Sequence, residues 1–139
     1  MGVAAVSYLI GSCNMAIIIS KFHKFKDIRD YGSGNAGTTN MLRTFGKRAA
    51  SYTFGGDFIK GALTVFVARA ALSGFELPFD IGYLAAIFVV VGHIFPVYFK
   101  FKGGKGVATA FGAMLVLNWI AFCTILVGLV PMLFIIRIV

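Results

Sequence analysis

Three long apolar stretches constrain the fold of this chain more than any other feature of its sequence. They cover residues 3–20, 49–72 and 79–99. A helix needs about 20 predominantly apolar residues to cross the hydrocarbon core of a bilayer, and each stretch is close to that length. The sequence therefore predicts an all-α integral membrane protein, a multi-pass helical bundle that forms a single transmembrane domain over residues 1–139.

The last part of the chain, residues 107–139, is apolar almost throughout. As one helix it would be about 50 Å long, whereas the hydrocarbon core is about 30 Å thick, so it must turn. Asn118 and Trp119 are its most polar and interfacial point. We therefore predict a short fourth helix over 107–117 and a fifth over 119–137 that returns Arg137 to the starting side. A break near Pro131 is the alternative.

The composition supports a membrane protein rather than one that binds nucleic acid. The chain is 59% hydrophobic, has a mean hydropathy of +0.89 and contains only five acidic residues. Its formal net charge is +8, but the thirteen lysines and arginines lie in short connections between apolar stretches rather than along one polar face. We expect membrane lipids and an anionic substrate as partners, and no nucleic acid. The oligomeric state stays open.

The basic residues also predict the orientation of the chain. Residues 21–48 form a connection with seven lysines and arginines, and residues 100–106 form another with three lysines. Connections rich in Lys and Arg usually remain in the cytoplasm. Both connections are therefore predicted to face the cytoplasm, which leaves the N-terminus outside.

The first of these connections contains a run of small and polar residues, with Arg43 one helical turn further on. The run comprises Gly32, Ser33, Gly34, Asn35, Ala36, Gly37, Thr38, Thr39 and Asn40. Glycines free the backbone to curl around an oxyanion, while hydroxyl and amide side chains donate hydrogen bonds. A flexible polar loop is the alternative interpretation. The position of the run, opposite a second glycine-rich loop, favours a phosphate site.

That second loop is Gly103-Gly104-Lys105-Gly106, between two predicted helices. Backbone N–H groups at the start of a helix are unpaired, and glycines let an anion approach them. Lys105 adds a positive charge at the same point. Val107 stands where a nucleotide-binding loop of the Walker type needs a Ser or Thr, so we predict a site for a phosphate or phosphate ester rather than a nucleotide.

Three polar residues lie within the apolar stretches. Asp57 and Lys60 share a helix face and predict a structural ion pair, with direct contact between Lys60 and a substrate phosphate as the alternative. His93 lies near the end of its stretch, and its role as a hydrogen-bond donor, a proton shuttle or a structural anchor stays open. The sequence shows no activated serine and no metal-ligand cluster, so we expect neither a metal nor another cofactor.

Three sequence blocks, taken together, resemble a known family. They are GSGNAGTTNMLRTFGK at 32–47, GGDFIKGALTVFVAR at 55–69 and GHIFPVYFKFKGGKGVATAFG at 92–112. In this order and spacing they are similar to the bacterial acyl-phosphate-dependent glycerol-3-phosphate acyltransferases, the PlsY family. The resemblance implies an enzyme of the bacterial cytoplasmic (inner) membrane with an active site facing the cytoplasm. It would transfer a fatty acyl group from acyl phosphate to the 1-hydroxyl of glycerol 3-phosphate, giving lysophosphatidic acid and phosphate.

The resemblance also implies site residues. Ser33 and Arg43 match the family's first catalytic motif, and the loop around Lys105 matches its phosphate-binding motif. Together with His93, which its position next to the predicted phosphate site singles out, the expected catalytic residues are Ser33, Arg43 and Lys105. Substrate binding is expected from Gly32, Gly34, Asn35, Gly37, Thr38, Thr39, Asn40, Lys60, Gly103, Gly104 and Gly106. We expect the first run to cradle acyl phosphate while Ser33, Arg43 and Lys105 hold glycerol 3-phosphate, although which loop holds which phosphate stays open.

Family members are longer than this chain. Their third motif, with a His, an Asn and a Glu near the C-terminus, has no counterpart in residues 1–139, and about five of the family's seven helices are expected here. We therefore expect a piece of a longer protein, whose activity alone stays open. The alternative function is a small multi-pass transporter or channel for a phosphate-bearing solute. A transporter site is expected near the bilayer midplane, whereas these polar clusters lie at one interface.

Overall fold

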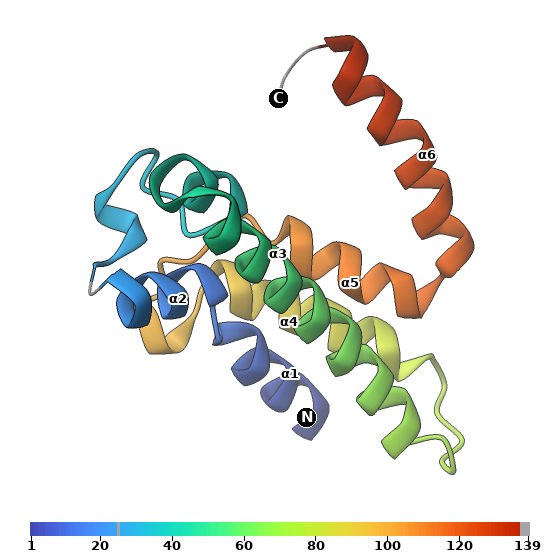
Figure 1. Ribbon diagram of the computed structural model, residues 1–139. Coiled ribbons are helices and arrows are strands. Elements are labelled where there is room, and N and C mark those ends of the chain that lie inside the picture. Colours follow the sequence, from blue (N-terminus) through green and yellow to red (C-terminus); the bar gives the residue numbers. More distant parts are fainter. Residues whose placement is uncertain (25, 137–139) are drawn as a thin grey trace.

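The protein is a bundle of α-helices (Figure 1). The computed structural model describes residues 1–24 and 26–136, and no strand occurs among them, which confirms the predicted fold class. The helices, in chain order, are α1 (Gly2–Ser12), α2 (Met15–Lys24), α3 (Thr38–Ala71), α4 (Ile81–Ile94), α5 (Val107–Leu117) and α6 (Trp119–Ile136), with short 3-10 turns η1 (Ile28–Asp30) and η2 (Val97–Phe99). The segments Gly2–Phe22 and Ile81–Phe99 are long and apolar enough to cross a membrane.

The first apolar stretch is not the single helix predicted over residues 3–20. The helix ends at Ser12 and starts again at Met15, so α1 and α2 are separate. Asn14, which is fully buried, begins the second helix by accepting a hydrogen bond from the N–H of Ile17 at 3.2 Å. Its amide nitrogen donates to the carbonyl of Ala36 at 3.2 Å. A polar side chain within the apolar stretch therefore bonds to the backbone in place of a regular helical turn.

The first basic connection is shorter than the range 21–48 predicted for it. Thr38 begins α3, so the residues from Thr38 to Arg43 lie on a helix rather than in a loop. Gly46 interrupts α3 with a φ of +84°, a conformation that glycine adopts more readily than other residues. The predicted crossing at 49–72 corresponds to the part of α3 after this interruption.

The later helices differ less from the prediction. The crossing predicted over 79–99 ends as a helix at Ile94, because Pro96 disfavours helical backbone in the residue before it. Helix α5 covers the predicted range 107–117, and Asn118 then caps α6 by accepting a hydrogen bond from the N–H of Ala121 at 3.0 Å. Because α6 continues to Ile136, the chain turns at Asn118 and not at Pro131. The position predicted for Arg137 lies outside the described residues.

Glycines let the helices pack closely in two pairs. A Cβ atom on Gly11 of α1 would collide with the carbonyl group of Val89 on α4, and a Cβ atom on Gly61 of α3 would collide with that of Thr109 on α5. Small residues at such crossings are typical of membrane helix packing, in which close backbone contact replaces the hydrophobic effect. Figure 1 shows that α6 stands apart from these two pairs and meets them only near its start, where Phe122 contacts Phe58 and Phe111.

The crossing of α3 and α5 predicts different effects for two similar substitutions. Gly61→Ala should lower the free energy of unfolding by about 1–3 kcal/mol, because the added methyl group meets rigid backbone. Gly55→Ala is the matched control, since a Cβ atom there has no neighbour within 4 Å and alanine favours the helix. Thermal unfolding of both variants in detergent measures the difference. Equal melting temperatures would show that the crossing is not tightly packed.

Candidate phosphate site

A cavity of about 310 Å³ lies where the start of α3 meets the start of α5. It brings together the two glycine-containing clusters that the sequence analysis singled out. Its lining consists of Asn35, Gly37, Thr38, Thr39, Phe54, Asp57, His93, Lys105, Gly106, Val107 and Ala108. The two clusters are more than 60 residues apart in the chain, from Asn35 to Lys105, so only the tertiary fold places them around one space.

Two helix N-termini open into this cavity. Gly37 precedes α3 and Gly106 precedes α5, and neither residue has a side chain that could cap the helix that follows. The first N–H groups of each helix are therefore available to a ligand, and both helix dipoles present their positive ends. Lys105, which is exposed, adds a full positive charge beside the start of α5. This combination attracts an anion, and a phosphate group above all.

Gly103 and Gly104 contribute to the cavity in a way that differs from the prediction. Their N–H groups donate to the carbonyls of Ile94 at 3.0 Å and His93 at 3.2 Å, so they are not free to bind an anion. A Cβ atom on Gly104 would collide with the carbonyl of Ala36 and with the His93 ring. These glycines therefore allow the two clusters to pack against each other, and the N–H groups left for a ligand belong to the first turn of α5.

Asn40 also has a different role from the one predicted. Its side chain is 1% exposed and does not line the cavity. The amide nitrogen donates to the carbonyls of Tyr31 at 2.9 Å, Asn35 at 3.1 Å and Ile28 at 3.2 Å, while the oxygen accepts from the N–H of Ser33 at 3.0 Å. All of its hydrogen-bonding groups are thus used by the backbone. Asn40 orders the loop before α3 instead of contacting a ligand.

The remaining predicted residues divide between the cavity and its surroundings. Asn35, Thr38 and Thr39 line the cavity with Lys105 and His93. Ser33 and Arg43 are exposed and lie outside the lining, as do Gly32 and Gly34. The structure therefore brings together the later part of the first run and the second loop, but not the two residues assigned to the first catalytic motif.

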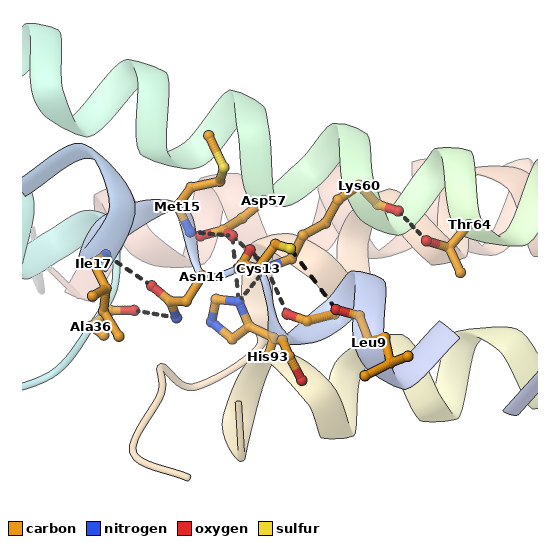
Figure 2. Close-up of polar contacts among 12 residues, drawn as sticks. Leu9, Cys13, Asn14, Met15, Ile17, Ala36, Asp57, Lys60, Thr64 and His93 are labelled. Atoms are coloured by element: carbon orange, nitrogen blue, oxygen red, sulfur yellow. Dashed lines mark hydrogen bonds and ion pairs between the residues drawn. The ribbon is translucent and has the colours of Figure 1, made fainter. Parts of the chain in front are cut away.

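Asp57, Lys60 and His93 form a buried polar cluster beside the cavity (Figure 2). The Lys60 Nζ atom lies 2.8 Å from Asp57 Oδ1, so the ion pair predicted from the sequence spacing is present, with side chains that are 9% and 2% exposed. Lys60 also donates to the carbonyls of Cys13 at 2.8 Å and Gly11 at 3.1 Å. Lys60 is absent from the cavity lining, so the alternative of a direct phosphate contact has no support.

Sequence reasoning missed Arg29, which connects the loop before α3 to the turn before α5. Its guanidinium donates to the carbonyls of Phe99 at 2.7 Å and Lys102 at 3.1 Å. It also pairs with Asp27 through Nε at 2.9 Å and Nη2 at 2.7 Å. The hydrogen bonds from Arg29 lower the pKa of the Asp27 carboxyl to about 2. The close spacing of Asp27 and Arg29 was visible in the sequence, but the carbonyls that Arg29 binds were not.

The lowered pKa of Asp27 predicts that its contribution to the stability of the fold depends on pH. A carboxyl whose pKa is about 2 when folded and about 3.9 when unfolded stabilises the fold above the unfolded value, and loses that contribution as the pH falls through 2. Asp27→Asn should therefore be less stable than the parent chain at pH 7, and the difference should shrink between about pH 5 and pH 2. Unfolding in detergent across this range measures it. A difference independent of pH would contradict the assignment.

Comparison with known proteins identifies the family. The family model described as glycerol-3-phosphate acyltransferase matches residues 1–139. The chain belongs to this family. A glycerol-3-phosphate acyltransferase of Coxiella burnetii is 50% identical over 122 residues, which are 86% of this chain and 61% of that protein. One from Neisseria meningitidis serogroup C is 49% identical over 114 residues, covering 82% and 57%. The chain thus spans about 60% of the length of these curated relatives.

Solved structures of the family have the same fold. PlsY (YgiH), an integral membrane glycerol 3-phosphate acyltransferase, matches in its glycerol 3-phosphate form with a TM-score of 0.83 and 32% identity, over 96% of this chain and 64% of that one. Its lysophosphatidic acid form matches with a TM-score of 0.79 and 30% identity, over 95% and 63%. Family and fold together make this chain an integral membrane protein, as predicted.

Proposed function

We propose that this chain forms the phosphate-binding part of an enzyme that transfers a fatty acyl group from acyl phosphate to the 1-hydroxyl of glycerol 3-phosphate. The products are lysophosphatidic acid and inorganic phosphate. The observation that carries the proposal is the cavity with two uncapped helix N-termini and Lys105, because both substrates bear a phosphate group. The names of the relatives and the two ligand forms of PlsY favour this enzyme over the alternative of a transporter.

The proposed reaction needs binding and positioning more than it needs a nucleophilic side chain. Acyl phosphate is a mixed anhydride and is already activated. The glycerol hydroxyl oxygen forms a bond to the carbonyl carbon, the bond from that carbon to the phosphate oxygen breaks, and the departing phosphate takes the hydroxyl proton. The protein then contributes orientation of the two substrates and stabilisation of the developing negative charge.

On this basis we assign roles to the residues in and around the cavity. Asn35, Thr38 and Thr39, at the start of α3, cradle the phosphate of the acyl donor. Lys105 and the first N–H groups of α5 bind the phosphate of glycerol 3-phosphate, with Ser33 and Arg43 reaching it from outside the cavity. These assignments give each phosphate one helix N-terminus.

We further propose that the cavity faces the cytoplasm of a bacterial cell, with the chain in the cytoplasmic (inner) membrane and its N-terminus outside. The basic connections support this orientation, because residues 21–48 and 100–106 together carry ten lysines and arginines, seven in the first and three in the second. The acyl donor then enters from the lipid, while glycerol 3-phosphate enters from the cytoplasm.

An assay that compares two acyl donors tests the proposed reaction directly. Lysophosphatidic acid should form from palmitoyl phosphate and glycerol 3-phosphate, but not from palmitoyl-CoA. The assay should compare residues 1–139 with the full product of the gene, both reconstituted in lipid. Activity of the full product alone would show that this chain carries only part of the site. If a folded, inserted full product transfers no acyl group from either donor, the proposal fails.

Lys105→Ala tests the phosphate contact. Loss of a charge-assisted hydrogen bond worth about 1.5–3 kcal/mol should weaken the apparent affinity for glycerol 3-phosphate by about 10-fold to 150-fold, with the fold retained. Lys102→Ala is the matched control, because Lys102 lies outside the cavity lining and its removal changes the net charge equally. The KM for glycerol 3-phosphate measures both. Equal effects of the two substitutions would remove Lys105 from the site.

A further inference from the structure

The buried ammonium of Lys60 has more partners than it has hydrogens. Four polar atoms surround Nζ: Asp57 Oδ1 and the Cys13 carbonyl at 2.8 Å, His93 Nδ1 at 3.0 Å and the Gly11 carbonyl at 3.1 Å (Figure 2). An ammonium group only donates, and it has three hydrogens to share. Because an ammonium has no lone pair, none of these neighbours can donate a hydrogen bond to Lys60.

This requirement decides which nitrogen of the His93 ring carries the proton. A hydrogen on Nδ1 would point at a donor only 3.0 Å away, which is an unfavourable contact. The competing acceptor for such a hydrogen is Asp57 Oδ1, which lies farther from Nδ1, at 3.4 Å, and already accepts from Lys60 at 2.8 Å. The contact with Lys60 therefore favours the tautomer whose hydrogen is on Nε2.

The other nitrogen of the ring, Nε2, lies beside Gly104. His93 lines the cavity, and its Nε2 atom lies against Gly104, where a Cβ atom would collide with it. Glycine at this position therefore keeps space in front of Nε2. A hydrogen on Nε2 is then available to an oxygen atom of a ligand in the cavity.

The break between α1 and α2 is what holds Lys60 in place. In a continuous helix the carbonyls of Gly11 and Cys13 would accept from the N–H groups of Met15 and Ile17. Instead, the Met15 N–H donates to Asp57 Oδ1 at 3.4 Å and the Ile17 N–H donates to the Asn14 side chain at 3.2 Å. Both carbonyls are thus free to accept from Lys60.

We infer that Lys60 is a positioning residue, which holds His93 as the neutral Nε2–H tautomer so that the ring donates a hydrogen bond to a substrate oxygen in the cavity. The role in acyl transfer rests on the function proposed above, whereas the tautomer does not. A ring held in this way is a donor and not a base, because Nε2 already carries a proton and Nδ1 is occupied by Lys60.

Nitrogen NMR of labelled histidine tests the tautomer without any substrate. The chain contains only two histidines, so His23→Gln leaves the signals of His93 alone. In lipid nanodiscs at pH 7, we expect one protonated nitrogen, Nε2, and one unprotonated nitrogen, Nδ1. A proton on Nδ1, or on both nitrogens, would overturn the inference. This result is independent of acyl transfer, so it also separates failure of the inference from failure of the proposed function.

Lys60→Met tests the coupling between the two residues. Without the ammonium, the Nδ1–H tautomer should become populated, donating to Asp57, and kcat should fall by about a hundredfold, the scale for removing one transition-state donor. The KM for glycerol 3-phosphate should change much less. In a His93→Ala background, which has no donor to position, the same substitution should cause little further loss of kcat. Additive losses would mean that Lys60 does not act through His93.

A second pair of variants keeps the test decisive if Lys60→Met does not fold. Glutamine places its amide nitrogen near the position of Nε2, whereas asparagine places it near Nδ1. His93→Gln should therefore retain at least about tenfold more activity than His93→Asn, because it keeps the donor in the cavity. Equal activities, or better activity of the asparagine variant, would contradict donation from Nε2.

Discussion

A positive charge buried among apolar helices must be surrounded by acceptors, and the ammonium of Lys60 meets this requirement in a way that shapes the rest of the bundle. Its partners come from three helices: Asp57 on α3, His93 on α4, and two carbonyls at the end of α1. Burial of such a pair is costly unless every remaining hydrogen-bonding group is satisfied. Because helix α1 ends at Ser12, the carbonyls of Gly11 and Cys13 are free to accept hydrogen bonds from Lys60. The resulting cluster joins α1, α3 and α4 and holds His93 beside the cavity.

The cavity depends on a second constraint, which is that two helices begin at the same place. Each begins after a glycine, so each leaves its first N–H groups without a side-chain partner. Buried N–H groups without partners are unfavourable, but here they open into a space large enough for a ligand. The same feature that would destabilise an ordinary helix end is therefore what supports the phosphate site proposed above.

The sequence was sufficient for properties that depend on local composition. The all-helical membrane fold, the turn at Asn118 and the ion pair of Asp57 and Lys60 all follow from apolar length, one polar point and helical spacing. The sequence was insufficient where contacts between distant residues determine the structure. The carbonyl of Cys13, which the break before Asn14 leaves free, binds Lys60, 47 positions away in the chain. The sequence also did not show that Asn40 bonds to its own loop and does not line the cavity, because the carbonyls that it binds come together only when that loop folds.

Arg29 has a consequence for the energetics of binding. By holding the carbonyls of Phe99 and Lys102, it fixes the turn before α5 against the loop before α3, so both walls of the cavity are in place without a ligand. Ordering flexible loops on binding costs about 0.5–1.5 kcal/mol for each immobilised side chain. Here that entropy loss occurs when the protein folds. A small phosphate ester, which can make few contacts, would then bind without the additional cost of ordering these loops.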